Sequence, residues 1–305
     1  MTDLIKNRSE ILFLYDIENA NPNGDPLNEN RPRFDSESSK VIVSDVRLKR
    51  TIRDYWYEYK GFNGKGEDKK DIFVRETEYQ DGDNTYIKDG KRRAKDFSES
   101  KEEVLNMCID IRIFGGVIPL KDASITLTGP TQFQMGKSLN KAEIVTEQGT
   151  GAFASSDKKS QATFRTEYKV PYAVIGFNGI INEKAAAYSK MTEDDKKLLL
   201  EGIWNGTKNL ISRSKYGQTP LLLLVINYKE PFYIGNLRQR LQLIHDEINE
   251  MQLRSVDDYK IDMTKIIEEL KINKDNIESV EFKVDSRLQL LNNGEIIKNI
   301  KKDEL

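Results

Sequence analysis

The chain contains 305 residues, of which 37% are hydrophobic and 32% are charged, and its 48 basic and 50 acidic side chains give a net charge of −2 at pH 7. This composition supports a buried core in one large domain or two smaller ones, and it excludes a protein that is basic as a whole, so any nucleic-acid site must be a local concentration of positive charge. No apolar run reaches the roughly eighteen residues of a membrane helix and no secretory signal is visible, so we expect a cytoplasmic protein with no membrane partner.

The chain has one cysteine, Cys108, and one histidine, His245. A single cysteine excludes an intramolecular disulfide and a cysteine-based zinc site, and a single histidine excludes a histidine-pair metal site. His245 lies in a stretch that predicts an amphipathic helix, where a partly packed surface side chain is the simpler interpretation. We therefore predict no cofactor, no metal site and no catalytic residue.

Residues 10–17, with the sequence EILFLYDI, predict a strand that is buried on both faces and central in its sheet. The polar loop that follows contains NPNGDP and is far longer than an ordinary turn. Three interpretations compete for it: a rigid turn held by its prolines and glycine, a calcium loop, and a surface where Asn21 and Asn23 face a phosphate or a base. The calcium loop is the weakest, because Asn30 stands where a glutamate is needed and a strand precedes the loop.

A helix is predicted over residues 44–60, with Ser44 as its N-cap and Asp45 in its first turn. The residues that recur at helical spacing are expected to pack on a core, and these are Val46, Ile52, Tyr55 and Tyr59.

The other faces of this helix carry four cations, which are Arg47, Lys49, Arg50 and Arg53. Four cations on a solvated face are ordinary. However, the first turns of a helix favour acids, so basic residues that begin there suggest an anionic partner. A nucleic-acid backbone is such a partner, since cations neutralise phosphates without reading sequence.

Two polar segments interrupt the apolar pattern. Residues 61–101 are rich in glycine, lysine and acid, and they include TYIKDGKRRAK, in which DG predicts the turn of a hairpin. Residues 137–163 lie between two strand-like stretches, ASITLTGPTQFQMG and RTEYKVPYAVIGFNGIIN. Between the two polar segments, SKEEVLNMCIDIRIFGG predicts a short helix and a return to the core.

The second half of the chain predicts a helix over residues 192–217 that Thr192 caps and Gly217 ends, a buried strand over 219–228, an amphipathic helix over 236–251, a helix over 262–272 and a closing strand over 279–285. Lys137, Arg213 and Lys215 lie beside small residues that would let a ligand backbone approach. Cations at a helix C-terminus are also ordinary partners of the helix dipole.

Without the insertions, the predicted order is strand, helix, strand, strand, helix, strand. This order predicts an α+β fold of the RRM-like (ferredoxin-like) type. The aromatic signature with which an ordinary RRM sheet stacks RNA bases is absent. Any RNA is therefore expected on loops and helices rather than on the face of the sheet.

Six stretches of the sequence form a pattern together: LYDIENANPNGDP, NRPRFD, SDVRLKRTIRDY, DIRIFGG, LTGPTQFQMGKSLN and SRSKYGQTPLLLLV. Together they resemble the Cas-seven family, which forms the backbone of the type I CRISPR surveillance complex (Cascade). The sequences of these stretches are most similar to subtype I-B, with subtype I-C next. The resemblance implies an RRM-like palm with a finger insertion and a thumb hairpin. The palm would occupy residues 1–60, 102–136 and, with C-terminal elements, 164–305; the fingers would occupy 61–101 and the thumb 137–163.

The resemblance also implies partners. Members of the family bind guide CRISPR RNA, stack head to tail into a helical filament, present the guide for pairing with target DNA, and assemble with Cas-five, Cas-six and Cas-eight type subunits. Besides the four helix cations, the predicted RNA contacts are Asn21, Asn23, Phe114, Gly115, Gly116, Lys137, Arg165, Arg213 and Lys215.

The alternative is an enzyme. Relatives in type III complexes cleave RNA with an aspartate in a loop near the first strand, and Asp25 and Asp35 lie in such a loop here. Two carboxylates could help to hold Mg²⁺ with substrate phosphates. The resemblance to type I members of the family favours a scaffold that does not cut RNA. A third class, a filament protein that binds no RNA, agrees less well with the clustered helix cations.

Overall fold

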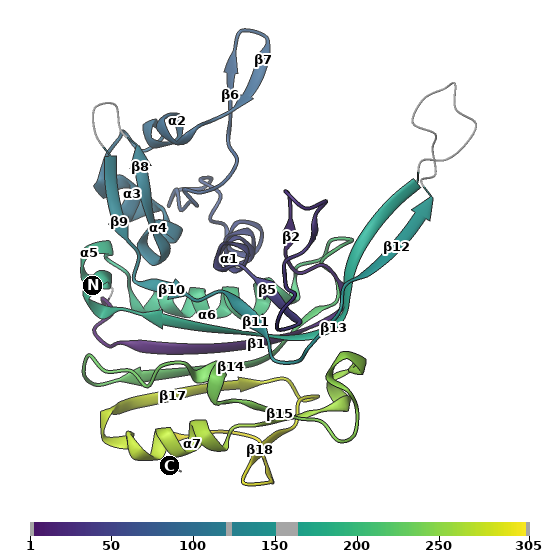
Figure 1. Ribbon diagram of the computed structural model, residues 1–305. Coiled ribbons are helices and arrows are strands. Elements are labelled where there is room, and N and C mark those ends of the chain that lie inside the picture. The colour runs from purple at the N-terminus through teal and green to yellow at the C-terminus, as the bar shows by residue number, and fades with distance from the viewer. Residues whose placement is uncertain (1–2, 120–123, 151–163, 303–305) are drawn as a thin grey trace.

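The computed structural model describes residues 3–119, 124–150 and 164–302 (Figure 1). Within these residues the fold is mixed α+β, and its largest element is a nine-stranded sheet. The strands of this sheet are β1 (Ser9–Ala20), β4 (Phe34–Asp35), β5 (Lys40–Val43), β10 (Thr131–Phe133), β11 (Gly136–Ser138), β12 (Val145–Thr150), β13 (Phe164–Ile181), β14 (Gln218–Tyr228) and β17 (Ile277–Val284). Their order is β17-β14-β1-β13-β11-β5-β4, and β10 and β12 also pair with β13.

Strand β1 lies at the centre of the sheet, antiparallel to β13 on one side and to β14 on the other. Its side chains alternate between two cores: Phe13 and Tyr15 belong to one, whereas Leu12 and Leu14 belong to the other. The predicted central strand with two buried faces is therefore confirmed. Apolar layers thus cover both faces of the sheet at β1.

One face of the sheet is covered by α1 (Asp45–Lys60) and α6 (Glu193–Lys208) (Figure 1). Both predicted N-caps are confirmed, since Ser44 accepts a hydrogen bond from the backbone N–H of Arg47 and Thr192 forms a capping box with Asp195. A short helix, α5 (Glu183–Ser189), precedes α6.

The predicted buried side of α1 is partly wrong. Ile52 and Tyr55 are buried as expected, but Val46 is 65% exposed and Tyr59 is 57% exposed. Leu48 and Trp56 take their places. Trp56 reaches the backbone of α6 through its indole N–H, which donates to the carbonyl of Leu198 at 2.9 Å, so packing against α6 sets the rotation of the helix.

The C-terminal layer covers the opposite face of the sheet (Figure 1). It consists of β15 (Gln242–Ile244), β16 (Lys260–Asp262), α7 (Thr264–Ile272), β18 (Leu290–Asn292), β19 (Glu295–Ile297) and the 3-10 turns Leu237–Arg240, Glu250–Gln252, Val256–Asp258 and Lys274–Asn276. The predicted helix over 262–272 and the predicted closing strand, β17, are confirmed.

The predicted helix over residues 236–251 is wrong. The segment begins with the 3-10 turn and continues into β15, which pairs with β16. His245 follows this strand rather than lying on a helix. The helical spacing of leucines is compatible with either structure. Pairing with a strand further along the chain decided between them, with Gln242 opposite Asp262, twenty residues downstream.

The first polar segment builds a separate subdomain with its own core (Figure 1). Its elements, extended by the residues that follow, are β6 (Glu78–Asp81), β7 (Asn84–Ile87), α2 (Gly90–Lys95), α3 (Lys101–Met107), α4 (Ile109–Phe114), β8 (Gly115–Pro119) and β9 (Ser124–Thr128). A hairpin does occur, but its turn is Gly82–Asp83 and not the predicted DG. The predicted DG is Asp89–Gly90. Asp89 caps α2, because its side chain accepts a hydrogen bond from the backbone N–H of Arg92 at 2.8 Å.

Two further predicted boundaries are wrong. Helix α6 ends at Lys208 instead of reaching Gly217, and the residues beyond it turn back along the end of β1, where Gly217 O accepts from Glu18 N at 2.8 Å. The stretch ASITLTGPTQFQMG is not one strand, because it divides at Gly129 and Pro130 into β9, which pairs with β8, and β10, which pairs with β13. No helix in the described ranges is long and apolar enough to span a membrane.

Candidate nucleic-acid interface

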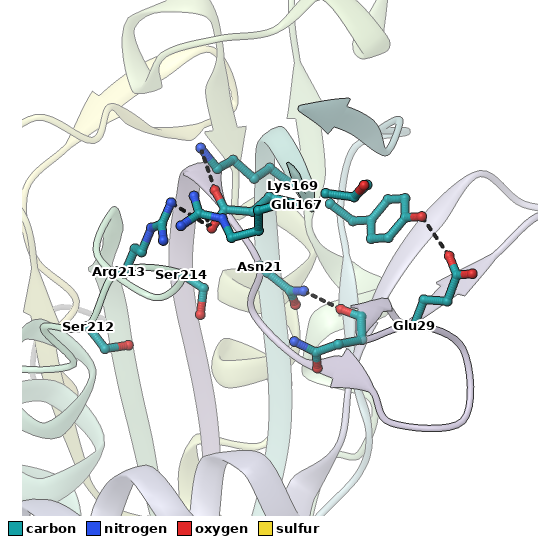
Figure 2. A pocket seen from close by; sticks show the side chains of 11 residues that line it. Asn21, Glu29, Glu167, Lys169, Ser212, Arg213 and Ser214 are labelled. Atoms are coloured by element: carbon teal, nitrogen blue, oxygen red, sulfur yellow. Dashed lines mark hydrogen bonds and ion pairs between the residues drawn. The ribbon is translucent and has the colours of Figure 1, made fainter. Parts of the chain in front are cut away.

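A groove of about 430 Å³ lies where four segments meet at one end of the sheet (Figure 2). The segments are the end of β1 with Asn21, the NPNGDP loop with Glu29 and Asn30, the first residues of β13, and the turn between α6 and β14. Its remaining lining residues are Arg165, Thr166, Glu167, Tyr168, Lys169, Ser212, Arg213 and Ser214. The groove thus brings together Asn21, Arg165 and Arg213, three residues that the sequence predicts as RNA contacts.

Glu167 lies among the cations of the groove and holds them (Figure 2). Its carboxylate is 2.8 Å from a guanidinium nitrogen of Arg165, 3.1 Å from one of Arg213 and 3.8 Å from the ammonium of Lys169. Lys169 also contacts Glu147 of β12 at 2.6 Å. Three cations therefore share one central carboxylate, which fixes their direction. With Glu147 the cluster contains two carboxylates, so one net positive charge remains for another anion.

The NPNGDP loop is held as a rigid hairpin beside this groove. Strands β2 (Gly24–Asp25) and β3 (Arg31–Pro32) pair, and Asp25 O accepts from the backbone N–H groups of Asn28 and Asn30. Glu29 accepts from the hydroxyl of Tyr168 at 2.6 Å, which ties the loop to β13. The geometry agrees with the rigid-turn interpretation of the loop.

Asn21 and Asn23 have different surroundings. Asn21 is 4% exposed; its amide nitrogen donates to Asn30 O at 2.7 Å, and its side-chain oxygen has no hydrogen-bond partner among the described residues. Asn23 accepts from the backbone N–H of Ser44 at 2.8 Å, so it orients the start of α1. Asn23 therefore has a structural task of its own, and Asn21 alone lines the groove.

The four cations of α1 do not form one surface. Lys49 contacts Asp45 at 2.9 Å and Arg50 contacts Asp54 at 2.6 Å, both as helical neighbours. Arg53 instead reaches the fully buried Asp110 of α4 at 2.9 Å. Of these three, only Arg50 has a side chain that is more than half exposed, at 56%.

Lys215 contacts the NPNGDP loop, and Arg47 is the cation whose charge acts on Lys215. Lys215 donates to Asn21 O at 2.5 Å, and Arg47 donates to Thr51 Oγ1 at 3.1 Å. Burial, together with the nearby positive charge of Arg47, lowers the pKa of Lys215 to about 8. Neither side chain forms an ion pair with a carboxylate in the part of the chain that the structure describes.

The predicted contacts Phe114, Gly115 and Gly116 are occupied inside the protein. Phe114 is buried against Trp56 with ring centroids 5.7 Å apart. The close backbone approach that the sequence predicts does occur, but a side chain at Gly115 would meet the backbone of Leu127 and Gly129. Gly116 continues β8 beside it. The approaching backbone is thus the chain's own.

The two aspartates of the enzyme alternative each have a cationic partner. Asp25 is 3.4 Å from Arg33, and Asp35 is 2.9 Å from Lys137. Hydrogen bonds from Ser38 and Lys137 hold the pKa of Asp35 well below its usual range. No cluster of three or more metal-binding side chains occurs within the described residues.

Several groove residues are absent from the sequence-based prediction, above all Glu167, Tyr168 and Lys169. A signal for them exists, because Arg165, Glu167 and Lys169 alternate and so share one face of a strand. This alternation does not show how long β13 is. The first residues of β13 extend beyond its pairing with β1 and pair with β12.

Comparison with known proteins gives one consistent result. The family model described as "CRISPR-associated protein Cas7" matches residues 7–264. A curated protein of Haloferax volcanii, named "CRISPR-associated protein Cas7", is 31% identical over 312 residues that cover 93% of this chain and 88% of its own. Two solved structures, described as "CRISPR RNA-guided surveillance complex, pre-nicking" and "CRISPR RNA-guided surveillance complex", contain chains with 10% identity and TM-scores of 0.48 and 0.44. Each covers 74% of this chain, and the matches cover 80% and 72% of those chains.

Proposed function

This chain belongs to the CRISPR-associated Cas7 family, and on that premise we propose that it is the subunit that binds guide RNA and forms the backbone of an RNA-guided surveillance complex. The observation that carries the proposal is the groove in which Asn21, Arg165 and Arg213 meet. These residues are far apart in the sequence, and the sequence predicts each of them as an RNA contact. Cations and amides suit a ribose-phosphate strand whose sequence varies, because phosphate contacts give affinity without base specificity.

The proposed architecture is an RRM-like palm with fingers and a thumb. The strand order β14-β1-β13-β10, with α1 and α6 on one face, supports the palm over residues 1–60, 102–136 and 164–305. Residues 61–101, which form much of the subdomain with its own core, are the proposed fingers. The ribbon of β12 and β13 supports a thumb over 137–163, although its residues 151–163 lie outside the described ranges (Figure 1).

Head-to-tail stacking into a filament follows from the same proposal. Heterologous contacts between identical subunits generate an open helix instead of a closed dimer. A net charge of −2 agrees with this, because a basic groove balanced by acidic surfaces lets subunits stack without strong repulsion. The proposal includes pairing of the bound guide with target DNA, assembly with Cas-five, Cas-six and Cas-eight type subunits, subtype I-B and a cytoplasmic location.

Removing two groove cations tests RNA binding. For Arg165→Met with Arg213→Met, we expect single-stranded RNA of any sequence to bind about 10- to 100-fold more weakly near 0.1 M salt, because two charge-assisted contacts are lost. The slope of log K against log salt should become shallower by about 1.4, at about 0.7 for each contact on a single strand. Fluorescence anisotropy over a salt series measures both quantities.

The matched control is Arg254→Met with Lys197→Met. It removes the same two positive charges, and these residues likewise pair with carboxylates, Glu143 and Asp194, but away from the groove. If the groove variant and this control bind RNA alike, the groove is not the RNA site.

The proposal contains no catalytic step. In a Mg²⁺-dependent assay on guide RNA paired with a complementary RNA, we expect neither strand to be cut, because Asp25 and Asp35 are each engaged by a cation. Cleavage that Asp25→Asn or Asp35→Asn abolishes would establish the enzyme instead, and denaturing gels distinguish the two results.

A further inference from the structure

Two half-buried cations, Arg47 and Lys215, lack within the described ranges the carboxylate partners that several other cations removed from solvent have. Arg53, Arg93 and Arg112 each contact a buried carboxylate, at 2.9, 2.6 and 2.7 Å. Arg47 and Lys215 contact only neutral oxygens, and Arg47 Nε has no hydrogen-bond partner among the described residues. Removing a cation from water without a carboxylate is costly, so such a pair indicates an anion that is supplied from outside.

Both cationic residues lie beside Gln218. Gln218 donates to Lys215 O at 3.0 Å and lines the same small cavity as Arg47. Lys215 donates to Asn21 O, while Asn21 N donates to Ser214 O at 2.8 Å. Both cations are only half-buried, so each keeps an approach from solvent.

The charged groups around the pair do not compensate it. The positive charge of Arg47 disfavours the protonated form of Lys215 and so lowers the pKa of Lys215. Burial lowers the pKa of Arg47, and the charge of Arg50 acts in the same direction; Asp54 opposes them but does not restore the ordinary pKa. The ammonium of Lys215 is therefore the weaker of the two cations and the one that releases its proton first.

Resting on the RNA binding proposed above, we propose that Lys215 and Arg47 hold one phosphate group of the bound RNA, and that a proton is taken up by Lys215 as this phosphate arrives. Asn21 positions Lys215 through its carbonyl oxygen. The phosphate supplies a negative charge where the described residues offer Lys215 no carboxylate, so the ammonium form of Lys215 becomes the stable one. No bond is made or broken; the proton comes from solvent or buffer.

The sign of the pH dependence follows from the lowered pKa of about 8. Below it, Lys215 is already charged and RNA binds at full strength; above it, binding must first protonate the amine. If the phosphate restores the ordinary pKa of about 10.4, affinity at pH 9 is about tenfold weaker than at pH 7. Calorimetry at pH 8 in two buffers with different ionisation heats should show net proton uptake.

The experiment uses the full chain and an RNA of adenine and cytosine only, since these bases do not titrate in this range. Lys215→Arg keeps its charge through pH 9, so it should bind RNA with no pH dependence and no proton uptake. Lys215→Met should bind more weakly at pH 7, also without pH dependence, and should be no less stable to heat because it removes an unpaired charge. Lys197→Met, at an exposed pair with Asp194, should behave as the wild type.

The outcomes separate this inference from the proposed function. If the wild type binds RNA equally at pH 7 and pH 9, or if Lys215→Arg keeps the wild-type pH dependence and proton uptake, the phosphate does not sit on Lys215, although RNA binding stands. If the wild type binds no RNA at either pH and low salt, the proposed function fails first.

Discussion

Replacing Asp110 with alanine is expected to lower the free energy of unfolding by about 3–5 kcal/mol. Asp110 is fully buried in α4 and accepts from Phe73 N at 2.8 Å, Val74 N at 3.1 Å and Arg53 Nε at 2.9 Å. Alanine would leave the buried N–H of Phe73, the partly buried N–H of Val74 and the Arg53 guanidinium without their acceptor, and a group that stays buried and unsatisfied carries its desolvation cost. Urea unfolding followed by circular dichroism measures the change.

The control for this variant is Asp54→Ala. Asp54 also pairs with an arginine of α1, but this pair with Arg50 is roughly half exposed, so its loss should cost about 0–1 kcal/mol. Equal losses for the two variants would mean that burial of Asp110 contributes nothing. The comparison also bears on Arg53: a residue that anchors α1 to α4 has less freedom to contact RNA than Arg50 has.

Gly115→Ala is expected to destabilise the protein by about 3 kcal/mol or more. Gly115 has φ +70° and ψ −169°, a conformation that is essentially restricted to glycine. An added Cβ would lie within 2.2 Å of Gly129 N and Leu127 O, both of them backbone atoms. The tight approach of β8 to the turn after β9 would have to open, and chemical unfolding would report this as a lower midpoint.

Gly61→Ala separates the two causes in this prediction. Gly61 ends α1 with φ +74°, but a Cβ there would meet no atom within 4 Å. Only the conformational strain remains, so the expected loss is about 1–2 kcal/mol. If Gly115→Ala costs no more than Gly61→Ala, the contact with Gly129 is not the reason for the glycine. A stable Gly115→Ala protein that no longer binds RNA would support the predicted RNA contact at Gly115.

Much of the secondary structure could be predicted from local chemistry. The apolar runs of β1 and β14, the Ser44 and Thr192 caps and the acids after Thr192 each act within a few residues, so the sequence alone determines where these elements begin. The sequence likewise marks residues 61–101 as a polar segment, and these residues form much of the subdomain with its own core. The local concentration of cations, in a chain whose total charge is near zero, pointed to an anionic partner.

The tertiary structure decided which of these residues meet. Residues 236–251 do not form the predicted helix, because part of this segment pairs with β16. Helix α6 ends at Lys208, because the turn that follows it bonds to the end of β1. The same long-range contacts decided the candidate site: Arg53 is bound by Asp110, whereas Arg165 and Arg213 share Glu167. Helical and strand periods report neighbours a few residues apart, but a cation's partner is set by strand register and helix rotation, and these follow only from packing the whole chain.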